Sequence, residues 1–135
     1  PALAGVKVAI PKAPGMKYRH YAPKAAVEVW EGPADLVAQA FLEAWQQDTA
    51  EETGFLVTEE LAERLPASSR VITYGQRRRP QTLAAGLFAA LRRFDALPVR
   101  SILAEGVEEA GLGQAVMNRL RKAAGQRVRR FAKGE

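Results

Sequence analysis

The densest group of side chains able to bind an anionic ligand lies between residues 17 and 21. Lys17, Tyr18, Arg19, His20 and Tyr21 are consecutive and supply cations, phenols and the one imidazole of the chain. Lys and Arg neutralise phosphate, and Tyr adds a ring face and a hydroxyl donor. Prolines on both sides restrict the segment and lower the entropic cost of ordering it on a ligand. The residue types predict a segment that binds a nucleotide or a carboxylate, with a basic linker packed on its own domain as the alternative.

Two further segments have the composition of an anion-binding site. Arg77, Arg78 and Arg79 are expected at the carboxyl edge of a sheet, where they would bind phosphate or an RNA backbone in a salt-sensitive manner. Gly111 and Gly113 precede a predicted helix, and such loops present backbone N–H groups to anions. The loop lacks the P-loop and dinucleotide-binding patterns, and two glutamates in it oppose an anion. A solvated basic loop and a helix-capping turn are the alternative interpretations.

The sequence does not supply a catalytic set or a metal site. One histidine and no cysteine exclude a Cys–His pair and a thiolate or histidine cluster for zinc. The glutamate pairs at 51–52 and 59–60 are interpreted as charges at helix ends. The basic stretch 119–133 has no aromatic platform for single-stranded nucleic acid. We therefore predict no catalytic residue and no metal ligand in this chain.

A regular alternation of strands and helices follows residue 25 and positions these segments. Val27 and Val29 alternate with polar or amphipathic neighbours, as in a strand. Further strands are expected over 55–57, 71–74 and 99–104, with a weaker one over 128–131. A helix is expected to open after Gly32-Pro33 and to end at Gly54, and others over 58–66, 81–96 and 112–124. This order predicts a Rossmann-like, three-layer α/β/α fold with a mostly parallel sheet of about five strands.

Charge is distributed unevenly along the chain. The net charge of +5 combines +5 in residues 1–24, −9 in residues 25–69 and +9 in residues 70–135. Basic ends of this kind attract polyanions such as nucleic acid, although a solvated basic surface gives the same composition. No apolar run reaches the roughly 20 residues that cross a bilayer. The start at Pro1, without a signal pattern, predicts a fragment or a processed chain.

The segment Pro14 to Pro23, PGMKYRHYAP, resembles the signature that joins the two domains of long-form threonylcarbamoyl-AMP synthases. A second segment, GLGQAVMNRLRKAA at 111–124, is similar to the late helix of that family's C-terminal domain. Because two long matches occur in the expected order, the resemblance covers essentially the whole chain. The family commonly has Ser before Pro-Gly-Met, whereas Ala13 stands here, so a hydroxyl contact at that position is missing.

The resemblance implies a role in tRNA modification. The parent enzyme would condense L-threonine, bicarbonate and ATP, with magnesium, into threonylcarbamoyl-AMP for the tRNA nucleoside threonylcarbamoyladenosine. Catalysis would lie in a YrdC-type N-terminal domain that is absent here, so this fragment is expected to be inactive alone and to hold no cofactor. Residues 1–24 would be the interdomain linker and residues 25–135 the accessory domain. Positions 17–21 match the segment that closes over the catalytic cleft, and His20 and Tyr21 are the favoured ligand contacts.

Two other functions stay open at this stage. A free-standing module would bind RNA or tRNA through the basic ends, with an affinity that falls steeply with salt. A small nucleotide-binding protein of Rossmann type would use the glycine loop. For all three functions we expect a cytoplasmic location and no contact with a membrane. If the chain is an accessory domain, we expect at most weak tRNA binding.

Overall fold

The computed structural model describes residues 22–134. The candidate segment from Lys17 to Tyr21 and most of the predicted linker lie outside these residues. Within them, no helix has the length and apolar character needed to cross a membrane. The predicted division at residues 24 and 25 stays a prediction.

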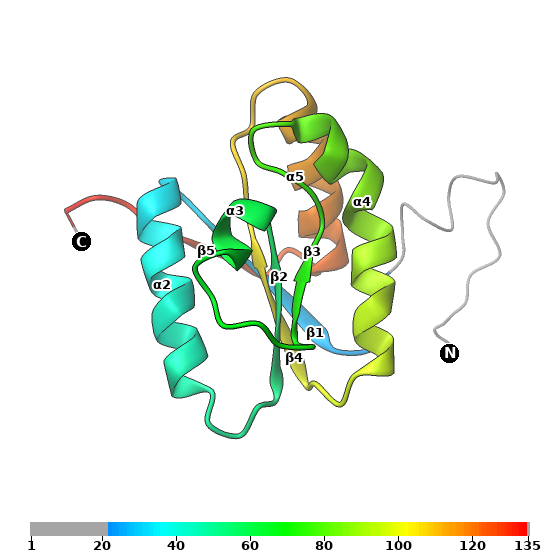
Figure 1. Ribbon diagram of the computed structural model, residues 1–135. Coiled ribbons are helices and arrows are strands. Elements are labelled where there is room, and N and C mark those ends of the chain that lie inside the picture. Colours follow the sequence, from blue (N-terminus) through cyan, green and yellow to red (C-terminus); the bar gives the residue numbers. More distant parts are fainter. Residues whose placement is uncertain (1–21, 135) are drawn as a thin grey trace, which may run out of the picture.

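The described residues form a five-stranded, all-parallel sheet in the order β3-β2-β4-β1-β5, with helices on both faces (Figure 1). This confirms the predicted α/β fold with a parallel sheet. The strands are β1 (Ala26–Glu31), β2 (Thr53–Val57), β3 (Val71–Thr73), β4 (Ser101–Glu105) and β5 (Val128–Arg130). The helices are α2 (Ala34–Gln47), α3 (Glu59–Ala62), α4 (Pro80–Arg93) and α5 (Leu112–Ala123), with a short 3-10 helix η1 (Phe94–Ala96) after α4.

Each face of the sheet buries its own apolar cluster. Val27 and Val29 of β1 pack with α4 and α5 on one face, whereas Trp30 of the same strand packs with α2 and α3 on the other. Alternate side chains of a strand point to opposite faces, so one strand serves both clusters. Because helices cover both faces, the central strands β2 and β4 are almost continuously buried.

The strand order explains why the helices divide as they do. The chain moves from β1 to β2 to β3 in one direction across the sheet, and then from β3 to β4 to β5 in the other. Right-handed crossovers place connecting helices on opposite faces when the direction of travel reverses. α2 and α3 therefore cover one face, and α4 and α5 the other.

Most predicted boundaries agree with the structure to within a few residues, but the expected role of Gly54 was wrong. Helix α2 ends at Gln47, and Gly54 lies inside β2. A side chain at Gly54 would collide with the ring of Phe94, which packs directly over this position. The glycine therefore marks a close approach between β2 and the end of α4, because only a residue without Cβ leaves room for the ring.

Candidate functional site

The site with the most polar chemistry lies where the carboxyl ends of β1 and β4 meet. These two strands are neighbours, yet the helices that follow them, α2 and α5, go to opposite faces. In doubly wound sheets such a switch point opens the crevice in which ligands bind. Glu31 ends β1 and Glu105 ends β4, and both side chains are largely buried. Two acids therefore occupy the position where this fold class places ligands.

Glu105, at the end of β4, is held by groups that follow two other strands, β2 and β3. Its Oε1 accepts a 2.7 Å hydrogen bond from the backbone N–H of Thr58, and its Oε2 accepts one of 2.6 Å from Nη2 of Arg77. The hydroxyl of Tyr74 donates to the backbone carbonyl of Glu105 at 2.6 Å. Burial raises the pKa of Tyr74 far above its ordinary value, and the charge of Glu105 raises it further. The phenol therefore acts as a neutral donor that fixes the end of β4.

Arg77 and Glu60 extend this network. The guanidinium of Arg77 also donates to Glu108 at 2.9 Å and to the carbonyl of Gly106 at 3.0 Å. Burial lowers the pKa of Arg77, but the hydrogen bond and charge of Glu105, with Glu108, outweigh it and hold the pKa above its ordinary value. The Glu60 carboxylate accepts the backbone N–H groups of Arg77 and Arg78 and pairs with the Arg78 side chain. Burial alone would raise the pKa of Glu60, but these hydrogen bonds hold it below its ordinary value.

A second cluster joins β1, α5 and the glycine loop. Arg121 of α5 donates to both carboxylate oxygens of Glu31, at 2.7 and 3.2 Å, and to Glu109 at 2.8 Å. The hydrogen bonds to Glu109 and Glu31 raise the pKa of Arg121, and Arg121 in turn lowers the pKa of Glu109. Arg130 of β5 lies 3.5 Å from Glu31. The two loop glutamates, expected to repel an anion, are thus each neutralised by an arginine.

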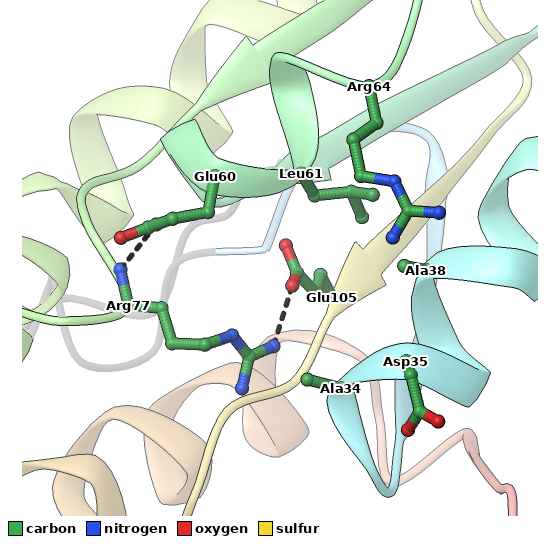
Figure 2. Close-up of a pocket in the computed structure, with 8 residues that line it drawn as sticks. All are labelled: Ala34, Asp35, Ala38, Glu60, Leu61, Arg64, Arg77 and Glu105. Carbon is green, nitrogen blue, oxygen red and sulfur yellow. Dashed lines mark hydrogen bonds and ion pairs between the residues drawn. The ribbon is translucent and has the colours of Figure 1, made fainter.

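A small open pocket of about 190 Å³ lies beside the Glu105 network. Figure 2 shows Glu105 and Arg77 on one side of it and Arg64 on the other, with the guanidinium of Arg64 turned toward Ala38. Asp35 lies at its edge with the carboxylate directed away from Glu105. Arg64 is exposed and forms no ion pair with the described residues. It is therefore the cation best placed to meet an anionic group that enters this pocket.

The structure brings some of the predicted site residues together. Arg77 contacts the glycine loop through Glu108 and Gly106, as expected if the arginine triplet and the loop share an edge. Gly111 precedes α5 with a φ of +58°, and the backbone of Gly113 packs against the carbonyl of Glu108, where a Cβ would overlap. Arg79 is the residue before α4 and is exposed. Anion binding by these residues stays a prediction.

Sequence reasoning missed the residues that organise the edge. Glu105, Tyr74 and Glu31 were not singled out as candidates from the sequence, and Glu60 was interpreted as a charge at a helix end. A signal was present for two of them, since Glu31 and Glu105 are acids at the ends of apolar strands and are each followed by Gly. The partner of each acid lies far along the chain, at Arg121 and Arg77, and only the sheet order brings the pairs together.

Solved structures support the fold. A crystal structure of Pyrococcus abyssi Sua5 complexed with L-threonine matches with a TM-score of 0.71 and 44% identity, covering 93% of this chain and 35% of that one. The C-terminal Sua5 domain of Pyrococcus horikoshii matches with a TM-score of 0.55 and 32% identity, covering 82% of this chain and 100% of that one.

Proteins with an assigned function show the same similarity at the level of sequence. The threonylcarbamoyl-AMP synthase of Pyrococcus abyssi is 45% identical over 130 residues, which are 95% of this chain and 36% of that protein. That of Bacillus subtilis is 44% identical over 118 residues, 87% of this chain and 33% of the relative. This chain thus spans about a third of the length of these relatives.

The parallel sheet, its strand order and the helices on both faces define a doubly wound α/β/α domain of Rossmann-like type. Its sequence matches a family model over residues 2–125. The chain belongs to that family, which is described as threonylcarbamoyl-AMP synthase, C-terminal domain.

Proposed function

We propose that this chain is the C-terminal accessory domain, with its interdomain linker, of an enzyme that makes threonylcarbamoyl-AMP from L-threonine, bicarbonate and ATP. The product would serve the threonylcarbamoyladenosine modification of tRNA in the cytoplasm. The observation that carries the proposal is the match of nearly the whole chain to a C-terminal domain family, together with coverage of only a third of each synthase. The partner of this domain would be a YrdC-type catalytic domain.

The polar groups at the carboxyl edge support an accessory role. Glu105, Glu60 and Glu31 each accept two or more hydrogen bonds from described residues, so their lone pairs serve to hold strand ends and loops together. A general acid or base needs a pKa near the working pH, and Glu60 is shifted away from neutral pH. The carboxyl edge of the sheet is therefore suited to form a rigid surface against which a neighbouring domain or linker can move.

The closing segment of the proposal is Lys17, Tyr18, Arg19, His20 and Tyr21. In the parent enzyme these side chains would cover ATP, with its magnesium, and L-threonine in the catalytic domain. One solved structure that matches this chain over 95% of its length is a Pyrococcus abyssi Sua5 variant with an adjacent His and Tyr replaced by alanine. His20-Tyr21 is the one such dipeptide here, because the chain has a single histidine. This supports the choice of His20 and Tyr21 as the ligand contacts.

The test compares three proteins in an assay of threonine- and bicarbonate-dependent pyrophosphate release from ATP. These are the N-terminal catalytic domain alone, that domain joined to this chain in one polypeptide, and this chain alone. We expect turnover from the joined protein, at least about tenfold less from the catalytic domain alone because its cleft does not close, and none from this chain. Turnover by this chain alone, or equal rates with and without it, would show the proposal to be wrong.

A further inference from the structure

The two helical layers of the domain carry opposite charge. α2 and α3 contain acids and no base, namely Asp35, Glu43, Glu59 and Glu60. α4 and α5 contain bases and no acid, namely Arg92, Arg93, Arg119, Arg121 and Lys122. Since these pairs of helices cover opposite faces, the separation of charge along the sequence becomes a separation in space (Figure 1).

Several bases that form no ion pair among the described residues lie toward one end of the basic layer. α4 and α5 pack side by side and run from the carboxyl edge of the sheet to its amino edge, as Figure 1 shows. Arg93 and Lys122 lie in their last turns, and further bases precede the amino ends of strands at this edge. We call this surface the basic patch and define it as the exposed residues Lys24, Arg93, Arg100, Lys122 and Arg127.

Contacts within the domain leave these cations available. Within residues 22–134 none of the five forms an ion pair, and the side chain of Arg127 donates to the carbonyl of Val27 at 3.0 Å. Two acids lie beside the patch: Asp95, which accepts the backbone N–H of Lys24 at 3.1 Å and engages a further partner, and the exposed Glu52, whose backbone carbonyl accepts the N–H of Arg100 at 2.7 Å. The patch therefore exposes five cations that form no ion pair within the described residues.

The negative ends of the helix dipoles do not account for the whole patch. They favour cations in the last turns of α4 and α5 and so explain Arg93 and Lys122. Lys24, Arg100 and Arg127 lie outside the helices, and each precedes a strand. Residues 1–21, outside the described part of the chain, contain four further bases, Lys7, Lys12, Lys17 and Arg19, and no acid.

The chemistry of the patch favours a polyanion over a protein surface. Protein interfaces place an apolar, aromatic-rich centre inside a polar rim. Among the described residues the exposed large hydrophobic side chain is Leu112, which begins α5 and so lies at the opposite end of that helix from Lys122. Arginines without an apolar centre are suited to phosphodiester oxygens, which they bind in a bidentate manner.

We propose that the basic patch binds the phosphate backbone of a structured RNA. The contact is with the backbone and is independent of sequence, so its free energy comes largely from release of counterions. This surface is separate from the closing role proposed above, because it needs neither ATP nor the catalytic cleft.

The experiment measures binding of a fluorescent, unmodified tRNA transcript to the 135-residue chain by anisotropy, at about 50 mM and about 200 mM salt. The patch variant is Arg93→Gln with Lys122→Gln. The matched control is Arg130→Gln with Lys133→Gln, two exposed bases at the carboxyl end of β5 and just beyond it. Both doubles remove the same net charge, and Gln keeps a good helix propensity. Circular dichroism establishes that each variant is folded.

We expect the wild-type chain to bind tRNA with an affinity that falls steeply with salt. The patch variant should bind at least about tenfold more weakly at low salt, with a log–log salt slope smaller by about two. The control should lose less than about threefold. Equal losses of affinity in both double variants would mean that net charge alone acts, which would overturn the proposal. Unchanged tRNA binding by the patch variant, or no tRNA binding by the wild-type chain, would also overturn it. None of these outcomes bears on pyrophosphate release, which is measured without RNA.

Discussion

Nη2 of Arg77 lies 2.6 Å from Oε2 of Glu105, and this ion pair joins the loop after β3 to the end of β4. Between those two strands lies β2, and the N–H of Thr58 just after β2 donates to the other oxygen of the same carboxylate. One buried acid thus fixes three neighbouring strand ends at the edge where the fold class binds ligands. The residues around this pair decide how rigid that edge is.

Arg77→Met should lower the free energy of unfolding by about 3 kcal/mol, because it leaves the buried charge of Glu105 without its cation. The matched variant Arg78→Met should cost less than about 1 kcal/mol, since Arg78 is exposed and its pair with Glu60 is solvated. Urea unfolding of both variants measures the difference. Adding Glu105→Gln to Arg77→Met should restore part of the loss; equal losses in the two single variants would contradict the role given to Arg77.

Gly86→Ala should destabilise the domain although Gly86 lies inside α4. In an exposed helix this change stabilises by about 1 kcal/mol through helix propensity. Here the new Cβ would overlap the backbone carbonyl of Tyr74, so the helix must shift away from β3, at a net cost of about 2 kcal/mol. Thermal unfolding gives the sign directly. A raised melting temperature would show that α4 moves freely against the sheet.

Tyr74→Phe should cost about 1.5 kcal/mol at neutral pH, because it removes the 2.6 Å hydrogen bond to the carbonyl of Glu105. The pKa of Tyr74 is raised in the folded state, so above about pH 10 the unfolded chain releases a proton that the folded chain keeps. The contribution of Tyr74 to stability is therefore complete below that pH and declines as the pH rises. Urea unfolding between about pH 8 and 11 should give a shallower alkaline loss for the variant than for the wild type. Parallel curves would mean that Tyr74 ionises normally.

His20→Ala with Tyr21→Ala, placed in the joined enzyme, should lower threonine-dependent pyrophosphate release by at least about tenfold. The two side chains are proposed to cover the ligands when the linker closes, so their loss exposes the cleft to water. Lys7→Ala with Lys12→Ala removes two charges from the same stretch of sequence and should change the rate by less than about threefold. A similar loss in both doubles would point to the charge of the segment and not to its His-Tyr pair.

The positions of most helices and strands were predictable because local chemistry sets them. The helix predicted over 58–66 begins at Thr58, whose hydroxyl caps α3 by accepting the N–H of Leu61 at 3.2 Å. Helix α4 begins at Pro80 and α5 follows Gly111, within one residue of the predicted starts of these helices. Gly54 misled the prediction because a glycine that ends a helix and one that admits a ring look the same in a sequence, and the ring of Phe94 is 40 residues away.

The sequence by itself determined the parallel α/β class, the family resemblance and the separation of acidic from basic segments. These depend on hydrophobic periodicity, on contiguous motifs and on composition, all of which are local. Only the tertiary structure decided which charges neutralise one another. Arg77 meets Glu105 and Arg121 meets Glu31 because the strand order brings distant strand ends and α5 to one edge. It also decided that the acidic and basic segments cover opposite faces, because the reversal of chain direction at β3 sends α4 and α5 to the other side of the sheet.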